Sequence, residues 1–138
     1  MVTVYDVEPN KLIEAVAEKL KGEIDVPDFI YFVKSGSHVE RPPDDPVKFW
    51  YTRLASVLRQ AYVKGNIGVN RLRRHYGKSK NRGVKPEHHR HAGGKIIRVA
   101  MQKLEKAGYL KRADNGKGRI ITGKGKQLLD NTAKEISK

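Results

Sequence analysis

Residues 104–112 read LEKAGYLKR, and after a glycine-rich turn residues 119–125 read RIITGKG. The glycine of the first stretch ends a helix, because glycine adopts the left-handed backbone of a helix C-cap at little cost. Tyr109–Ala113 and Arg119–Thr122 are then predicted as two strands. Between them lies Asn115-Gly116, a pair typical of tight hairpin turns with positive φ. A helix that runs directly into a basic hairpin indicates a winged helix-turn-helix.

Three amphipathic helices support this fold, and we predict them at Phe49–Lys64, Val69–Tyr76 and Lys95–Ala107. Each helix repeats apolar residues three and four positions apart, which places them on one face. The residues predicted to face inward are Trp50, Leu54, Val57, Leu58, Ala61, Leu72, Tyr76, Ile97, Ala100, Met101 and Leu104. Polar and basic residues occupy the opposite faces, so each helix is expected to bury one side in a shared core.

Further helices flank this unit. One is predicted over Leu12–Leu20, a short one within Val26–Val33, and a last one after Thr122. The predicted fold class is therefore mostly α, a winged helix-turn-helix with added N-terminal and C-terminal helices and a two-stranded β-hairpin wing. We expect residues 1–138 to form a single domain. A plain helical bundle is the alternative, and the hairpin argues against it.

Two segments lack a helix or strand pattern. Ser35–Pro46 contains Pro42-Pro43 and is predicted as a surface connection. Gly77–Gly94 is rich in Gly, Lys and His and is predicted as a loop of 18 residues. Compact domains rarely leave so long a loop without purpose, so we expect either a function or disorder there.

The composition restricts the class of protein. None of the 138 residues is cysteine, which excludes disulfides and Cys-based zinc sites and fits a reducing compartment. No apolar run approaches the roughly 18 residues of a membrane-spanning helix. The first residues also lack the basic and apolar regions of a signal peptide. We therefore expect a soluble, cytoplasmic protein with no membrane role.

Charge is separated along the chain, whose net charge is +14. Residues 1–47, an acidic helical part, hold 5 Lys and Arg against 10 Asp and Glu, whereas residues 48–126, a basic core, hold 22 against 3. The net charge of +19 in the basic core is self-repulsive unless a polyanion binds it. Nucleic acid is the usual polyanion, because basic side chains displace its condensed counterions. A membrane surface or an acidic protein is a weaker alternative, and the acidic part could instead bind a basic protein.

The distribution of the cations favours RNA over DNA. A DNA-binding winged helix inserts its third helix into the major groove, but the exposed face of residues 95–107 offers one Gln among long cations and no Asn, Ser or Thr. Cations also occupy the other predicted elements, which suits a folded RNA that surrounds the protein. The predicted RNA-binding residues are Arg53, Ser56, Arg59, Arg71, Arg73, Arg74, Lys78, Lys80, Arg82, Arg90, Lys95 and Arg98.

Other residue patterns are less specific. Trp50 and Tyr62 are expected in the core, whereas Tyr76 and Tyr109 could either pack or stack on bases. The run of residues 88–91, HHRH, lacks the four ligands of a zinc site, and neighbouring cations would oppose a dication. We expect these imidazoles to contact RNA, and His38 and His75 to be structural or exposed. No catalytic arrangement is present, so no enzyme activity, metal or cofactor is predicted.

Motifs along the whole chain resemble the archaeal and eukaryotic small-subunit ribosomal protein S19e family. The most specific is FWYTRLAS at residues 49–56. Further matching residues are Val2-Thr3-Val4, Asp6-Val7, Val26-Pro27, Arg59, Tyr62, Gly65, Gly68-Val69, Tyr76-Gly77, Arg82-Gly83-Val84, Pro86, His88, Leu104-Glu105, Thr122 and Gly125. Eukaryotic members carry Trp at the position of Phe49 and Phe at that of Trp50, which leaves open which ring packs deepest.

The resemblance implies a function as well as a helical fold around a winged helix. It implies a structural constituent of the small ribosomal subunit that binds rRNA in the head of the particle and supports maturation from precursor rRNA. Its partners would be that rRNA and other small-subunit proteins. Arg53, Ser56 and Arg59 lie in the matching block and Arg98 at a basic position of the third helix, so these, with Lys95, are expected to contact rRNA.

The oligomeric state distinguishes the rRNA-binding hypothesis from the alternative, a DNA-binding winged-helix transcription regulator. Such a regulator would form a twofold dimer and bind a palindromic duplex with a salt-sensitive preference. We expect a monomer on size-exclusion chromatography, and no preference for a palindromic duplex in a competition binding assay. A dimer that selects the palindrome would favour the regulator.

Overall fold

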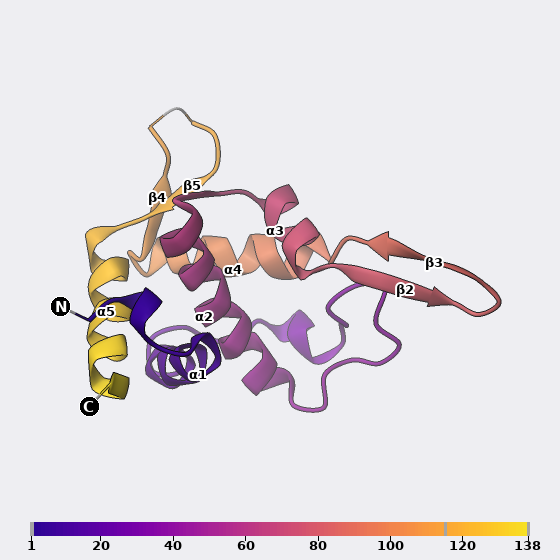
Figure 1. The fold of residues 1–138 in the computed structure, drawn as a ribbon, viewed down its shortest axis with the longest axis horizontal. Coiled ribbons are helices and arrows are strands. Elements are labelled where there is room, and N and C mark those ends of the chain that lie inside the picture. Colours follow the sequence, from indigo (N-terminus) through magenta and orange to yellow (C-terminus); the bar gives the residue numbers. More distant parts are fainter. Residues whose placement is uncertain (1, 115, 138) are drawn as a thin grey trace.

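A winged helix forms the centre of the molecule in this computed structural model, which describes residues 2–114 and 116–137 (Figure 1). Its elements are α2 (Pro46–Lys64), β1 (Asn66–Ile67), α3 (Val69–Tyr76), α4 (Gly94–Lys106), β4 (Leu110–Arg112) and β5 (Arg119–Ile121). The strands form an antiparallel sheet in the order β1-β5-β4. The mostly α winged-helix fold class is therefore confirmed. Strand β1 was not predicted, because two residues are too few to show a strand pattern.

Helix α2 lies at the centre of the core. Its buried residues include Trp50, Leu54 and Leu58, all fully inaccessible to solvent, and α1 and α4 both pack against it. The helix begins at Pro46, three residues before the predicted start. Asp45 caps it by accepting a hydrogen bond from the Lys48 amide at 3.2 Å, and proline is favoured in a first turn because its missing N–H has no helical partner there. The sequence pattern predicts Asp45 and Pro46 as part of the preceding loop, so the start of the helix was predicted too late.

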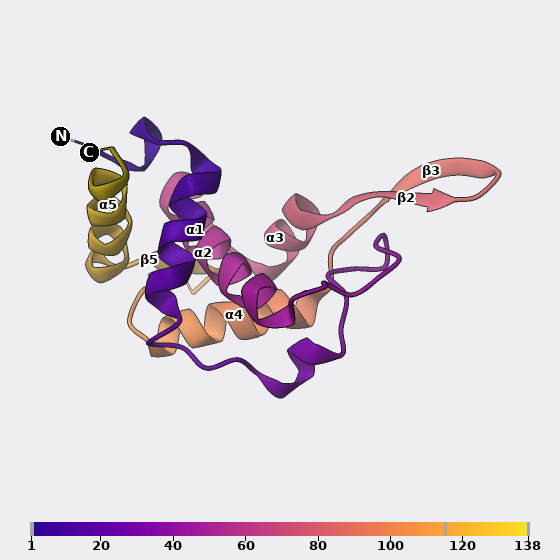
Figure 2. The ribbon, with the colours of Figure 1, turned by 90° about the horizontal axis from the view of Figure 1, so that it is seen from below.

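Helices α1 (Pro9–Leu20) and α5 (Gly123–Ser137) cover the end of the molecule opposite α3 (Figures 1 and 2). Lys19 joins the two helices, because its Nζ lies 2.9 Å from Thr132 Oγ1 and 3.0 Å from Glu135 Oε2. Two 3₁₀ helices, η1 (Val4–Asp6) and η2 (Asp28–Tyr31), complete the N-terminal part. Both flanking helices and the short helix within residues 26–33 are thus present as predicted.

The predicted loop over residues 77–94 was wrong, because most of it forms a β-hairpin. Strands β2 (Lys78–Arg82) and β3 (Lys85–Arg90) pair antiparallel, with Gly83 at φ +73° in the turn. The hairpin extends away from the helical body (Figures 1 and 2). Every residue of β3 is exposed, so neither face carries the apolar alternation by which strands are recognised.

Backbone contacts fix the base of this hairpin. The Gly93 amide donates to the Ser35 carbonyl at 2.8 Å, and the Ala92 amide donates to the Arg73 carbonyl at 2.9 Å. Gly36 and Ala92 also form an isolated β-bridge. The segment before α2 therefore holds the start of α4 and the end of β3 in place.

The predicted β-hairpin wing is present in the structure. Its strands lie within the predicted ranges, and Gly116 and Gly118 have φ of +74° and +78°. Asn115, the other half of the predicted turn pair, lies outside the described residues. Gly118 must be glycine, because a Cβ there would lie 2.5 Å from the Ile67 carbonyl oxygen. Residues 117 and 118, at the end of the wing turn, thus pack against β1.

Replacing Leu104 by alanine tests the core. Leu104 is fully buried in α4, so Leu104→Ala should lower the free energy of unfolding by about 2–5 kcal/mol. Val84 at the hairpin tip is fully exposed, and Val84→Ala should change that free energy by less than about 0.5 kcal/mol. Urea unfolding followed by circular dichroism measures both. Equal effects of the two variants would contradict the assigned core.

Candidate nucleic-acid interface

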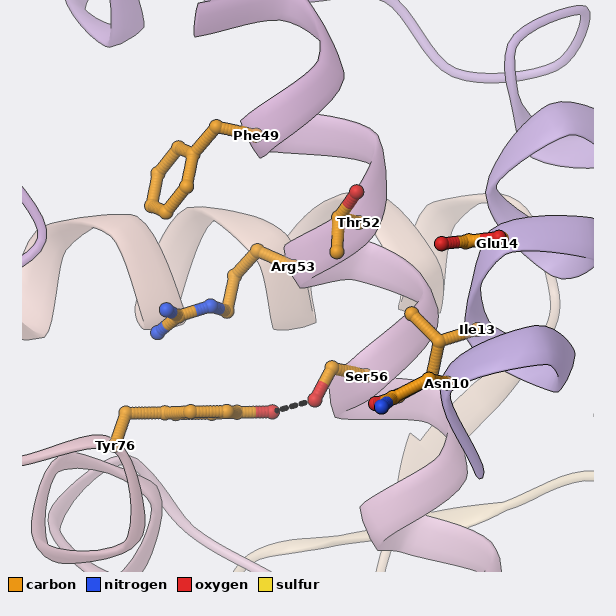
Figure 3. A pocket seen from close by; sticks show the side chains of 8 residues that line it. All are labelled: Asn10, Ile13, Glu14, Phe49, Thr52, Arg53, Ser56 and Tyr76. Carbon is orange, nitrogen blue, oxygen red and sulfur yellow. Dashed lines mark hydrogen bonds between the residues drawn. The ribbon is translucent and has the colours of Figure 1, made fainter. Parts of the chain in front are cut away.

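One face of α2 carries a polar stripe of Arg53, Ser56 and Arg59, as predicted. The Arg53 guanidinium lies over the Tyr76 ring, 3.9 Å from its centre, and 5.2 Å from the centre of the Phe49 ring (Figure 3). Ser56 Oγ lies 2.7 Å from the Tyr76 hydroxyl, which fixes that ring. The guanidinium is thus oriented by two aromatic rings, and no carboxylate in the described structure forms an ion pair with it.

Burial changes the electrostatics of this stack. It lowers the pKa of Arg53 from its usual value, while the neighbouring Tyr76 acts in the opposite direction. Arginine stays protonated at neutral pH even so. Burial also raises the pKa of Tyr76. Tyr76, which the sequence left open, is therefore a half-buried support for a cation rather than a free stacking surface.

The stripe continues onto α3. Arg59 Nε is buried and has no hydrogen-bond acceptor among the described residues. Beyond it, an open hollow of about 370 Å³ is lined by Lys64, Arg71, Arg74 and His75. None of the described residues that line this hollow is a carboxylate, so its chemistry suits an anion such as a backbone phosphate. We call the surface formed by these residues the α2–α3 face; it consists of Arg53, Ser56, Arg59, Lys64, Arg71, Arg74 and His75.

The exposed hairpin forms a second basic surface. Lys78, Lys80, Arg82, Lys85 and Arg90 lie on it against a single acid, Glu87. Beyond its base the hairpin packs on no other element of the described chain through a substantial contact. A two-stranded hairpin without an apolar face is a poor stabiliser of a domain core, so its shape and charge are suited to contact with a partner. We call it the basic finger.

Helix α4 carries a third group of cations. Arg98 and Lys95 are exposed, and Lys95 Nζ lies 4.5 Å from the centre of the Phe29 ring. Arg73 of α3 and Arg98 meet at Gly94, where an added Cβ would lie 3.3 Å from Arg73 Cδ and 3.6 Å from Arg98 Nη2. The sequence pattern predicts Arg73 on the solvent-exposed side of its helix. Instead it is half-buried and its Nε donates to the Ala92 carbonyl at 2.9 Å, which supports the hairpin base.

The far end of α4 is flanked by acids. Glu23 and Asp25 line a hollow of about 260 Å³ together with Lys103 and Lys106. The Tyr109 hydroxyl donates to the Glu23 carboxylate, and burial together with this bond raises the pKa of Tyr109. Carboxylates here would face the phosphates of a duplex bound along α4, so the arrangement does not favour the DNA-reading alternative.

Sequence reasoning missed two exposed aromatic residues. Tyr31 is 51% exposed and Phe32 is 83% exposed. Both belong to the apolar run of residues 26–33, which resembles a buried helix, and no sequence signal separates their exposed rings from the buried Ile30. Trp50 is fully buried as predicted, and Tyr109 is buried as well.

The described residues hold no group of three or more His, Cys, Asp or Glu side chains that could bind a metal ion. His88 and His89 are consecutive in β3, so their side chains point to opposite faces of the hairpin. Across the same residues, no helix is both long and apolar enough to cross a membrane.

Comparison with known proteins identifies the family. The family model for ribosomal protein S19e matches residues 3–138, nearly the whole chain. The chain belongs to the ribosomal protein S19e family. Proteins named small ribosomal subunit protein eS19 from Haloarcula marismortui and Aeropyrum pernix are 45% and 44% identical to it. Both alignments cover 99% of this chain, and 92% and 90% of those proteins. The eS19A protein of Schizosaccharomyces pombe is 43% identical over 96% of the chain and 92% of its own length.

Membership of the S19e family gives the chain a structural role in the ribosome and not an enzymatic one. The resemblance seen in the sequence is therefore confirmed. The structure also shows which aromatic ring at the start of α2 packs deeper. Trp50 is the deeply packed ring in this S19e protein, whereas Phe49 is half-buried beside Arg53.

His38 makes stability sensitive to pH. Burial, followed by the nearby charges of Lys78, His89, Arg53 and Lys34, lowers the pKa of His38. As the pH drops below about 6.5, His38 therefore binds a proton in the unfolded chain before it does so in the folded chain. Stability falls over this range as the pH drops.

His38→Gln tests this dependence, since glutamine does not titrate. The free energy of unfolding is measured by urea titration at about pH 7.5 and about pH 5.5, one unit on either side of the ordinary histidine pKa of about 6.5. Between these two pH values it should fall less in the variant than in the native protein. An equal fall in both proteins would contradict a lowered His38 pKa.

Proposed function

We propose that the chain is a structural constituent of the small ribosomal subunit that binds rRNA and supports maturation of the subunit from precursor rRNA. Its relatives in archaea and a fungus carry the name of a small-subunit protein at 43–45% identity. The observation that supports rRNA binding is the distribution of cations over three separate surfaces: the α2–α3 face, the basic finger and the start of α4. These cations form no ion pair with a described residue.

A folded RNA fits these surfaces better than a duplex. One duplex meets one side of a small protein, whereas the finger extends away from the body that carries the α2–α3 face (Figure 1). An RNA with tertiary structure presents phosphates from several directions. The proposed contacts to phosphate come from the α2–α3 face and the finger, with Lys95 and Arg98 beside them.

The acidic N-terminal part has a different proposed role. Glu18 and Glu135 are exposed on α1 and α5, the helices at the end of the molecule opposite the finger (Figures 1 and 2). Carboxylates there would repel RNA. We infer that this end faces solvent or neighbouring small-subunit proteins, and that the chain is monomeric outside the cytoplasmic ribosome.

Removing three cations from the finger tests its role. The combined Lys80→Ala, Arg82→Ala and Lys85→Ala variant should fold normally, because these side chains lie on the exposed hairpin. Its binding to small-subunit rRNA should weaken. The dependence of log affinity on log salt should flatten by about two units, since each phosphate contact contributes roughly 0.7–0.9.

The matched control removes three cations from the opposite end. Lys11→Ala, Lys126→Ala and Lys134→Ala change the net charge equally on the exposed surfaces of α1 and α5. This control should keep both the affinity and the salt dependence of the native protein. Equal weakening by the two triple variants would show a response to net charge alone and would contradict the finger's role.

A second variant tests the body of the protein. Arg59→Glu combined with Arg98→Glu should leave the protein folded, as judged by circular dichroism, and abolish its incorporation into small subunits in cells that lack the native protein. Sedimentation of subunits followed by immunoblotting measures incorporation. Normal incorporation of this variant would count decisively against the proposed function.

A further inference from the structure

A hollow of about 310 Å³ lies between α1 and α2, next to the Arg53 stack (Figure 3). Its volume is at the lower end of the range for small-ligand pockets, roughly 300–1,000 Å³. Two apolar side chains and six polar or partly polar ones line it. They are Ile13, Phe49, Asn10, Glu14, Thr52, Arg53, Ser56 and Tyr76.

The charges in this hollow have opposite sign on its two sides. Glu14 stands on α1, Arg53 lies on the far side over Tyr76, and Thr52 and Ser56 lie between them on α2 (Figure 3). Glu14 has no ion-pair partner in the described part of the chain. Among those residues, Asn10 and Thr52 also make no side-chain hydrogen bond. The hollow therefore presents donors and acceptors that are free for a ligand.

We propose that this hollow binds one unpaired guanine base of the RNA, an inference that rests on the proposed function. A phosphate alone is a poor occupant, because Glu14 would repel it. A cationic side chain of another protein is equally poor, because it would meet Arg53. An uncharged base avoids both penalties and places its flat faces against Ile13 and Phe49, as unpaired RNA bases do in aromatic and apolar pockets.

Guanine matches the two charges better than the other bases. Its Watson–Crick edge carries adjacent N1–H and N2–H₂ donors, which a carboxylate accepts with both oxygens. The adjoining major-groove edge carries the O6 and N7 acceptors that arginine recognises. Adenine, cytosine and uracil each lack either the paired donors or the paired acceptors. Glu14 thus selects the base, and Arg53 binds its acceptor edge.

The test uses the full chain and short oligouridine strands that carry one guest base, labelled for fluorescence anisotropy. The guest is guanine, hypoxanthine, adenine, cytosine or uracil. Hypoxanthine lacks only the N2 amine of guanine, so its strand should bind about tenfold more weakly through loss of one hydrogen bond to a carboxylate. The other guest bases should bind at least as weakly as hypoxanthine.

Two variants separate base recognition from general RNA affinity. Glu14→Gln should bind the guanine and hypoxanthine strands equally, because glutamine replaces one acceptor oxygen by an NH₂ donor and so cannot accept from N1–H and N2–H₂ with two oxygens. Glu18→Gln is the matched control. It lies one turn along α1 and pairs with Lys21, with Glu18 Oε1 2.8 Å from Lys21 Nζ, outside this hollow, and should keep the preference.

Equal affinity of the native protein for all five strands would overturn the guanine site, and so would a guanine preference that survives Glu14→Gln. Neither result would affect the proposed function, which is tested separately by incorporation into small subunits. Conversely, a guanine preference in a protein that fails to incorporate would support the site while contradicting the ribosomal role.

Discussion

The burial of α2 is the constraint on which the rest of the structure depends. Trp50, Leu54 and Leu58 are inaccessible to solvent, and each such side chain contributes about 1.5–3 kcal/mol when it leaves water. Because α1 and α4 pack on this helix, contact with a partner is confined to its outer side, which carries the polar stripe. The Arg53 side chain is consequently held by its neighbours before any ligand binds, which lowers the entropy cost of binding.

The same scaffold separates the charges. Of the four ion pairs among the described residues, three involve lysines of the acidic N-terminal part, and the fourth joins Arg119 to Glu105 at 2.9 Å. The cations of the finger and of the α2–α3 face have no share in these ion pairs. Their mutual repulsion is a cost that the hydrophobic core offsets in the free protein and that a polyanion removes on binding. Under the proposed function, stability and RNA affinity are therefore linked through the same side chains.

The fold was largely predictable from the sequence, and the reasons are local. The bounds of α3 and the position of the wing follow from glycines that permit a helix end and a tight turn, and from apolar residues at helical spacing. The finger was missed because its strands bury nothing, so no apolar alternation marks them. The start of α2 was misplaced because the Asp45-Pro46 signal lay inside a proline-rich loop.

The candidate site was less accessible to sequence reasoning. Arg53, Ser56 and Arg59 share a face because of helical spacing alone, which the sequence shows. The exposure of Phe32, the engagement of Arg73 with the Ala92 carbonyl and the position of Glu14 across from Arg53 depend on contacts between segments far apart in the chain. Such contacts are set by packing, and periodicity carries no information about them.

The most direct measurement is crosslinking of this protein to RNA in native small-subunit particles, mapped to the nucleotide and to the residue. Crosslinks are expected on at least two separate surfaces, the basic finger and the α2–α3 face, to RNA segments distant in sequence, with few around Glu18 and Glu135. Crosslinks confined to one side of α4 and the wing, on a single RNA helix, would contradict this expectation.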